Sequence, residues 1–246
     1  MMLNQAAMSE VSNPFRVACV TGGAKRIGRA LVLALHQANY NIIIHYHTSE
    51  SEAMELVNYC NAIRPQSAKS VQGDLENFET LPQLTWRIIN SFGRLDCLVH
   101  NASRFYPTPF GQISQQDWQN LFLTNAQTPL FISQYLYPYL KKSQGCIISI
   151  LDIHANGKPF GGYTVYNMAK AAHQMMVQSL AIELAPDIRV NGIAPGINIL
   201  PIEGSEQALT AETIDKICRA VPLKRIGTPQ DIAQVAVFLA AAPYIT

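Results

Sequence analysis

The chain predicts a single-domain α/β fold in which helices cover both faces of a doubly wound parallel sheet. Short continuous apolar runs, typical of strands buried on both faces, alternate with longer helical patterns. A glycine-rich turn joins the first strand directly to the first helix. The predicted strands are residues 16–21, 41–46, 69–72, 96–100, 145–151 and 188–193. The predicted helices are residues 26–39, 50–63, 78–92, 115–141 and 163–185.

The first predicted strand and helix are joined by a turn suited to a nucleotide. The apolar run Arg16–Val20 leads into Thr21–Gly28, and a helical pattern of apolar residues follows at once. Glycines allow close backbone approach, and a helix N-terminus presents unpaired N–H groups to a pyrophosphate. This order of strand, turn and helix predicts a dinucleotide site in a Rossmann-type domain. Ligands of such sheets bind beyond the carboxyl ends of the strands.

The second predicted strand ends without the acidic residue that would hydrogen-bond the ribose hydroxyls of NAD. It reads His45-Tyr46-His47-Thr48-Ser49, and the first carboxylate is Glu50. Hydroxyl and imidazole groups can donate to a 2′-phosphate, and no carboxylate in the strand end repels it. This favours NADPH as the cofactor, with Lys25, Arg26 and His47 as candidate cations. For His47, a simple turn-capping role is equally open.

The predicted helix 163–185 carries Tyr166 and Lys170, which are four residues apart and therefore share one helix face. An ammonium group beside a phenol favours the phenolate and lowers a pKa that is ~10 for free tyrosine. We expect this pair to supply a proton to a substrate at neutral pH. Tyr163, one turn earlier, can flank the same pocket or pack locally.

Composition and charge exclude several classes of function. The chain has 246 residues, of which 48% are hydrophobic and 14% charged, and its net charge is +1. No global charge attracts nucleic acid or an anionic membrane, so a small-molecule substrate is expected. No apolar run approaches the roughly 18 residues of a membrane span. Residues 1–15 are expected to form a flexible tail that lacks the features of a secretion signal.

Cysteine and histidine spacing adds to these exclusions. The five cysteines are dispersed without a CxxC pair, as expected of a reduced cytoplasmic protein. The six histidines show no ligand spacing except at His45 and His47, which alternate on opposite faces of a strand. We therefore expect no metal site. No repeat or linker divides residues 16–246, which we expect to form one domain.

Six motifs along the chain are similar to those of the short-chain dehydrogenase/reductase family. From about residue 16 to its end, the chain resembles the pteridine reductases of that family most. The resemblance implies an oxidoreductase that assembles as a homotetramer through the helix with the Tyr and Lys pair. The motifs are Thr21–Gly28, Gly73-Asp74-Leu75, Asn101-Ala102, Asn125, the pair Tyr166 and Lys170, and Asn191–Gly196.

The resemblance also implies roles for individual residues. The expected catalytic residues are Asn125, Asp152, Tyr166 and Lys170, with Asn125 bending its helix and holding a water that leads to the lysine. The expected substrate contacts are Arg26, Ser103, Phe105, Asp152 and Tyr166. The expected cofactor contacts are Gly22, Lys25, Arg26, Ile27, His45, His47, Thr48, Ser49, Asp74, Leu75, Asn101, Ala102, Ser103, Tyr166, Lys170, Pro195 and Gly196.

Three features favour a pterin as the substrate. Most of the family has glycine where Arg26 stands, and a guanidinium there could bridge a cofactor phosphate and a polar heterocycle. Residues 101–109 match the pteridine reductase pattern, in which Ser103 hydrogen-bonds the pterin and Phe105 stacks on it. Carbonyl reductases carry serine where Asp152 stands. A carboxylate disfavours an alkoxide but can shuttle a proton to a ring nitrogen, which suits reduction of a C=N bond in a dihydropterin or dihydrofolate.

Two other functions remain as alternatives. The first is a carbonyl reductase of the same family, of the 3-oxoacyl-carrier-protein or sugar type. A serine in place of Asp152 would have indicated it, and Ser149, the nearest rival, is expected to lie inside its strand. The second is a non-catalytic sensor or scaffold that binds NADPH, against which the intact set of Asn125, Tyr166 and Lys170 argues.

The sequence departs from the resembled family at two places. Thr48 stands where the pteridine reductases usually carry arginine, so the sequence does not show how a 2′-phosphate is held. The chain stops at Thr246, where the family continues into a last strand, so residues 16–246 are expected to lack that strand. Residues 196–204 are expected to lie over the substrate, followed by a mobile lid up to about Ala220.

Overall fold

A computed structural model describes residues 15–198 and 209–246 of the chain. The predicted tail lies outside the described residues except for Phe15, and so does most of the predicted loop over the substrate. All described strands belong to one parallel sheet with the order β3-β2-β1-β4-β5-β6. Every predicted strand is confirmed. The strands are β1 Val17–Val20, β2 Asn41–Tyr46, β3 Ala68–Gln72, β4 Cys97–His100, β5 Cys146–Ile150 and β6 Arg189–Ile193.

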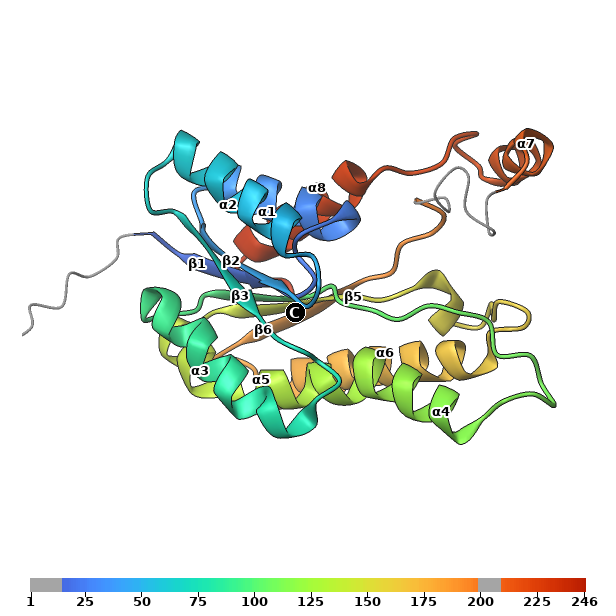
Figure 1. Ribbon diagram of the computed structural model, residues 1–246, viewed down its shortest axis with the longest axis horizontal. Helices are drawn as coiled ribbons and strands as arrows, with labels where there is room; N and C mark the ends of the chain where they lie inside the picture. The colour runs from blue at the N-terminus through green and yellow to red at the C-terminus, as the bar shows by residue number, and fades with distance from the viewer. Residues whose placement is uncertain (1–14, 199–208) are drawn as a thin grey trace, which may run out of the picture.

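Helices cover both faces of this sheet, as Figure 1 shows, with α1, α2 and α8 on one face and α3, α5 and α6 on the other. Helix α4 continues the second layer, and α7 stands apart from the sheet. The helices are α1 Arg26–Gln37, α2 Glu50–Ile63, α3 Leu81–Phe92, α4 Gln115–Phe122, α5 Thr128–Ser143, α6 Thr164–Glu183, α7 Ala211–Ala220 and α8 Pro229–Ala241.

The central strands β1, β2, β4 and β5 read as largely apolar runs because each one feeds two cores. The outer strands β3 and β6 mix buried with more exposed residues. Along β1, Ala18 and Val20 belong to the core under α1, α2 and α8, whereas Val17 and Cys19 belong to the core over α3, α5 and α6. All four side chains are fully buried. Successive strand residues point to opposite faces, so both faces must be apolar where helices cover both.

The predicted helix 115–141 is wrong in one respect, because the structure divides it. A π-helical segment, Leu123–Gln127, separates α4 from α5. It carries Asn125, the residue expected to bend this helix. Pro129 opens α5 and has no N–H to continue a regular ladder. Segments of this kind occur often at functional sites.

Two helices, α7 and α8, were absent from the prediction. The start of α8 is marked by a capping box, in which the Thr228 hydroxyl and the Asp231 carboxylate each accept a main-chain N–H. Its buried face packs on α1 within the first core. Helix α7 has no buried residue, so it contributes nothing to either core.

The strand order places the expected ligand site between β1 and β4. The chain leaves β1 toward one side of the sheet and β4 toward the other, so the loops after these strands diverge and open a crevice.

Strand β6 is one edge of the described sheet. Ile245 and Thr246 lie against this edge, where the Thr246 hydroxyl accepts the N–H of Val190 at 2.9 Å. The absence of a family strand beyond β6 stays a prediction.

Candidate active site

The turn after β1 approaches the loop after β4 so closely that two of its positions require glycine. Gly22 has a φ of +59°, and a Cβ on Gly28 would lie 2.1 Å from the carbonyl oxygen of Gly22. Asn101, just after β4, donates its side-chain amide to the carbonyl oxygens of Thr21 and Gly22 at 2.9 and 3.0 Å. No side chain caps the N-terminus of α1, so its first N–H groups remain available to a pyrophosphate.

His45 holds this turn from inside the protein. Its Nδ1 accepts the N–H of Gly22, and its Nε2 donates to the carbonyl oxygen of Gly73, both at 3.1 Å. Burial lowers the pKa of the ring to about 4, so the imidazole is neutral at pH 7 and one tautomer satisfies both contacts. The predicted side-chain contact of His45 with the cofactor does not fit this structure, because both ring nitrogens are already used.

The residues expected to hold a 2′-phosphate lie together where β2 meets α2. His47 and Thr48 are exposed, and the hydroxyl of Ser49 does not cap α2, although Ser49 directly precedes it. Lys25 lies beside them, because its ammonium pairs with Glu52 in the first turn of α2 at 2.6 Å. Both side chains of this pair are about half exposed, so the pair contributes little to stability and Lys25 is free to turn toward another anion.

The end of β3 adjoins the same region. His47 Nε2 lies 3.9 Å from a carboxylate oxygen of Asp74, an ion pair only when the imidazole is protonated. The other oxygen of Asp74 accepts the N–H of Glu76 at 2.9 Å. Leu75 is buried, and its carbonyl oxygen accepts the Thr128 hydroxyl at 2.7 Å. The loop after β3 is therefore fixed in place by contacts on both sides.

Arg26, the first residue of α1, has an unusual backbone conformation. Its φ of +51° lies in the left-handed region, where a residue with a Cβ is strained by roughly 1 kcal/mol or more. The side chain is exposed, and within the described ranges no hydrogen bond or ion pair involves its guanidinium. The side chain is thus free to meet a ligand. Ile27, the next residue, packs against the first core instead.

Tyr166 and Asp152 form the centre of the site. The phenol donates a hydrogen bond to Asp152 Oδ2 at 2.7 Å, and Asp152 Oδ1 accepts the N–H of His154 at 2.9 Å. Asp152 directly precedes the short 3-10 turn Ile153–Ala155 after β5, and Tyr166 lies in the first turn of α6. The structure therefore brings together two residues that are 14 positions apart, as the expected catalytic pair requires.

In this structure burial and Asp152 set the pKa of the Tyr166 phenol, in the direction opposite to the lowering expected from Lys170. Burial, followed by the charge and the hydrogen bond of Asp152, raises the pKa of Tyr166 above its usual value. Lys170 is itself buried, and burial lowers its pKa to about 8, although Asp152 opposes the shift. Its ammonium donates to the carbonyl oxygen of Ile150 at 3.0 Å and lies 5.9 Å from the Tyr166 ring centre. At neutral pH the phenol keeps its proton, which a proton donor needs.

The Asn125 side chain hydrogen-bonds the loop after β4, which carries the expected substrate contacts Ser103 and Phe105. Its side-chain oxygen accepts the Ser103 hydroxyl at 2.6 Å. Its amide nitrogen donates to the carbonyl oxygens of Arg104 and Leu121 at 3.0 and 2.9 Å. The side chain is buried, and both N–H groups of its amide are used within the protein. The water expected at Asn125 stays a prediction.

Phe105 lies in an aromatic group at the mouth of the site. Its ring stacks on Tyr163 with centres 4.5 Å apart and planes 14° apart, and meets Tyr166 edge-on at 4.8 Å. Phe160 extends the group by packing on Tyr163 at 4.6 Å. Phe105 is 53% exposed, so part of its ring surface remains open to a planar ligand.

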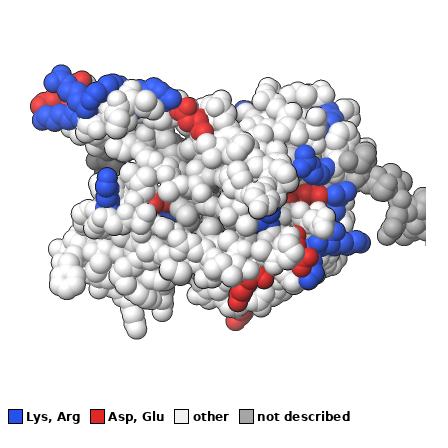
Figure 2. Space-filling model, turned by 180° about the vertical axis from the view of Figure 1, so that it is seen from behind, with Lys and Arg blue, Asp and Glu red and all other residues white. Residues whose placement is uncertain are grey.

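The remaining expected contacts surround the same crevice. The N–H of Ala102 donates to the Thr21 hydroxyl at 3.1 Å. Pro195 accepts the N–H of Ile153 at 3.2 Å, and Gly196 follows it beyond β6. Gly196 and Ile153 line a cleft of about 660 Å³ that reaches α7. Figure 2 shows the surface hollowed beside the projecting α7 lobe, on which charged side chains gather.

Sequence reasoning missed several residues that shape the site. Thr108 accepts the N–H of Val165 at 3.2 Å and so joins the loop after β4 to the start of α6. Ser149 is fully buried inside β5, 3.0 Å from His173, so it is not a substrate contact, as expected. Glu76 pairs with Arg104 across 28 positions. The two residues are far apart in the sequence, so no local pattern predicts that they form a pair.

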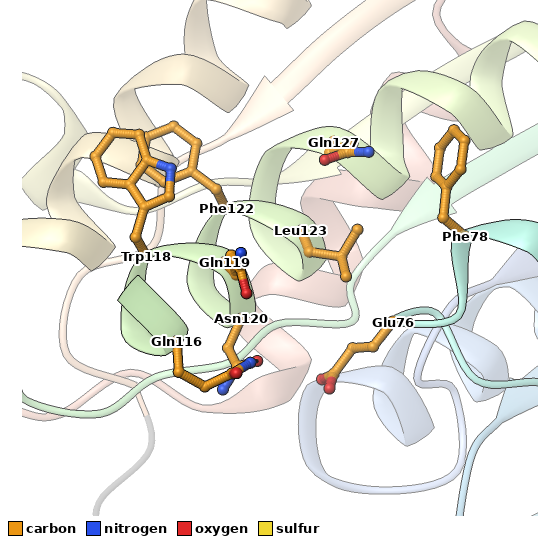
Figure 3. A pocket seen from close by; sticks show the side chains of 9 residues that line it. All are labelled: Glu76, Phe78, Gln116, Trp118, Gln119, Asn120, Phe122, Leu123 and Gln127. Carbon is orange, nitrogen blue, oxygen red and sulfur yellow. Dashed lines mark hydrogen bonds between the residues drawn. The ribbon is translucent and has the colours of Figure 1, made fainter. Parts of the chain in front are cut away.

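A second cavity, of about 520 Å³, lies on the other side of Glu76. Figure 3 shows its lining side chains, which come mainly from α4 and from the segment between β3 and α3. Its walls are aromatic and amide groups with the single carboxylate of Glu76. None of the expected site residues lines it, so it is separate from the candidate active site.

The described ranges contain neither a candidate metal-binding cluster nor a candidate membrane-spanning helix. No cluster of three or more His, Cys, Asp or Glu side chains could hold a metal ion in residues 15–198 and 209–246. In the same ranges, no helix has the length and apolar character to cross a bilayer. All five cysteines are free thiols.

Comparison with known proteins places this geometry in context. A family model described as Enoyl-(Acyl carrier protein) reductase matches residues 22–246. Pteridine reductase 1 of Leishmania tarentolae is 34% identical over 271 aligned positions, covering 94% of this chain and 92% of the relative. The hydroxynaphthalene reductase-like protein Arp2 of Metarhizium acridum is 28% identical, covering 92% of this chain and 88% of the relative. An uncharacterized oxidoreductase of Mycobacterium tuberculosis, MT0954, is 32% identical, covering 92% and 85%.

Proposed function

Because this chain belongs to the short-chain dehydrogenase/reductase family, we propose that it is an NADPH-dependent reductase of a dihydropterin, with dihydrofolate as a second substrate. As a family member it is an oxidoreductase whose Rossmann-type fold binds a nicotinamide coenzyme. The proposal concerns which coenzyme and which substrate. The observation that carries it is the hydrogen bond from Tyr166 to the carboxylate of Asp152.

The residues present fit a dinucleotide. The glycine turn leaves no room for a Cβ at Gly28, and α1 begins without a side-chain cap, so main-chain N–H groups can meet a pyrophosphate. Exposed Thr48 and the unused hydroxyl of Ser49 can donate to a 2′-phosphate, and Lys25 can add a cation. The side chains of Asp74 and Leu75 bound the adenine end. These features favour NADPH over NADH.

The proposed proton transfer uses Tyr166 as the donor. Bound NADPH supplies a hydride to a ring C=N carbon of the substrate. Tyr166 carries a proton at neutral pH and can pass it to the reduced ring, although its raised pKa makes the phenol a weaker acid than free tyrosine. Asp152, which accepts a hydrogen bond from the phenol in this structure, can relay a replacement proton from solvent. Lys170 holds the nicotinamide ribose and offers a cation that stabilises the phenolate while the proton is away.

The proposed substrate pocket is built from the loops after β1, β4 and β5. Arg26, which has no partner among the described residues, can bridge the coenzyme phosphate and the heterocycle. Ser103, which Asn125 holds at 2.6 Å, can hydrogen-bond the pterin. Phe105 offers a flat surface, where offset stacking contributes about 0.5 to 1.5 kcal/mol beyond burial.

A carbonyl reductase is the second candidate, which the similarity to a hydroxynaphthalene reductase-like protein keeps open. In such an enzyme the Asp152 carboxylate would face a developing alkoxide and oppose it by charge repulsion. A non-catalytic NADPH sensor would not need Asn125, Tyr166 and Lys170 arranged around one crevice. Both alternatives therefore fit the described side chains less well than a pterin reductase.

We also propose assembly into a homotetramer through α6, within a cytoplasmic enzyme. Of the apolar side chains expected on the far side of this helix, Ala171, Ala172 and Met175 are exposed. Met176 and Leu180 instead pack against the second core. A second copy of the chain can cover these exposed side chains. Light scattering of the purified protein measures the mass of the assembly and so tests whether it is a tetramer.

The experiment that tests the function follows NADPH absorbance with dihydrobiopterin, dihydrofolate and an acetoacetyl thioester. We expect turnover of at least one of the two reduced heterocycles and little with the thioester. Turnover of the thioester alone would indicate a carbonyl reductase, and no turnover with NADPH bound would indicate a sensor. Equal rates with NADH and NADPH at equal concentration would overturn the coenzyme assignment.

A further inference from the structure

An ion pair joins the loop after β3 to the loop after β4 beside the candidate active site. The guanidinium of Arg104 donates from Nε and Nη2 to the two carboxylate oxygens of Glu76, with Nη2 to Oε2 at 2.7 Å. The side chains are 45% and 26% exposed, so the pair is partly shielded from water. A fork of this kind fixes direction as well as distance, which a single contact does not.

Each partner of the pair between Glu76 and Arg104 lies beside residues that are expected to contact a ligand. Arg104 stands between Ser103 and Phe105, the two expected substrate contacts on this loop. Glu76 follows Asp74 and Leu75, two of the expected cofactor contacts, and its N–H donates to Asp74 at 2.9 Å. The pair therefore connects a loop that meets the coenzyme with a loop that meets the substrate.

A third element joins the same pair. The Thr124 hydroxyl, in the π-helical segment, donates to the Glu76 carboxylate at 3.2 Å. The neighbouring Asn125 holds the Arg104 carbonyl oxygen at 3.0 Å and the Ser103 hydroxyl at 2.6 Å. On its outer side Glu76 borders the cavity of Figure 3, so the segments on that side do not pack tightly against it. Residues 103–105 are therefore held by these polar contacts together with the stacking of Phe105 on Tyr163.

We propose that Glu76 and Arg104 are positioning residues that hold Ser103 and Phe105 at the angle needed to receive the substrate ring. The inference rests on the proposed function of this site. The pair acts through its neighbours, since neither charged group needs to touch the substrate. It also links substrate binding to the coenzyme loop, so that the substrate site is complete only when the segment after β3 is in place.

The test compares Glu76→Gln and Arg104→Lys with the unaltered protein. Glu76→Gln keeps the shape and removes the charge, and Arg104→Lys keeps the charge and removes the fork. For both variants we expect the KM for the reduced pterin to rise about fivefold or more, with kcat and the KM for NADPH within about twofold. Glu76→Gln combined with Arg104→Lys should show little more than the larger single effect, because both changes break one interaction.

The matched control is Lys141→Gln, which removes an ion pair of similar exposure with Asp187, at 2.7 Å, from the far end of α5. It should leave all three kinetic constants unchanged. Hydrogen–deuterium exchange of residues 101–110 gives a readout without turnover. Exchange should quicken in Glu76→Gln and Arg104→Lys but not in Lys141→Gln.

Two outcomes overturn the inference. One is a pterin KM in both variants that equals that of the unaltered protein, with unchanged exchange in residues 101–110. The other is an equal loss in kcat, both KM values and thermal stability, which would mark the pair as a general structural contact. If the unaltered protein reduces no pterin or folate, the proposed function fails. In that case unchanged exchange in residues 101–110 still overturns the positioning role of the pair.

Discussion

The coenzyme half and the substrate half of the crevice are built by different means. Around β1 and β2, a buried side chain fixes the turn, because His45 joins the N–H of Gly22 to the carbonyl of Gly73. Around the ends of β4 and β5, loops with exposed residues are held by contacts between side chains, such as Asn125 on Ser103 and Phe105 on Tyr163. The first half is thus held through bonds to its main chain, and the second through contacts between side chains.

The largest expected effect is on the chemistry of the substrate half. Tyr166→Phe removes the proposed proton donor and its hydrogen bond to Asp152 while leaving the ring edge against Phe105. We expect kcat to fall by about 10²- to 10⁴-fold, with the affinity for NADPH nearly unchanged. Stopped-flow absorbance and coenzyme titration measure the two quantities. Near-normal turnover would show that another group donates the proton.

The second largest expected effect is on the glycine turn of the coenzyme half. Gly28→Ala places a Cβ 2.1 Å from the carbonyl oxygen of Gly22, so the turn must shift. We expect a loss of about 3 kcal/mol in the free energy of unfolding, with greatly weakened NADPH binding. Gly161→Ala is the control in the substrate half, because its Cβ would meet nothing within 4 Å. Urea denaturation of both variants should separate the halves, and equal losses would contradict the comparison.

The sequence predicts the two halves unequally. The six strands and the glycine turn follow from local patterns, because the central strands are apolar on both faces and the turn needs glycine. The strand order, which puts the crevice between β1 and β4, depends on pairing between distant segments. The role of His45 could not be predicted, because its partners come from two other strand ends. The pairing of Glu76 with Arg104 and the raised pKa of Tyr166 depend on burial and on distant neighbours. The break in helix 115–141 was signalled only by Pro129 and by the expected bend at Asn125.

A third effect is the dependence of stability on pH. Burial lowers the pKa of Lys170 to about 8, whereas an unfolded lysine titrates near ~10.4. Between these values Lys170 binds more protons in the unfolded chain than in the folded one, so its contribution to stability rises with pH across this window. The buried thiols of Cys19 and Cys60, whose pKa values burial raises to about 12 and about 11, act in the opposite direction, so the effect of Lys170 is the difference between the unaltered protein and a Lys170 variant. The gain is roughly 3 kcal/mol at most, and Lys170→Met should remove it. Urea denaturation from pH 7.5 to 10 measures the slope, and an equal slope in the variant would place the titrating group elsewhere.

The smallest expected effect is at Arg26, where the two halves meet. Substitution there should raise the stability of the fold and weaken the affinity for the substrate. Arg26→Gly relieves a residue with a φ of +51° and should stabilise the fold by roughly 0.5 to 1 kcal/mol. The same change should raise the pterin KM, because the guanidinium is lost. Gln66→Gly is the control, since it relieves a φ of +58° away from the site. Both variants should gain stability, and only Arg26→Gly should lose substrate affinity.

The most direct test of the account replaces the carboxylate beside the phenol. Asp152→Ser should lower the turnover of dihydrobiopterin or dihydrofolate with NADPH, while turnover of an acetoacetyl thioester stays equal or rises. That result would show that Asp152 adapts the site to a C=N bond. Faster reduction of the pterin by Asp152→Ser would contradict the central claim.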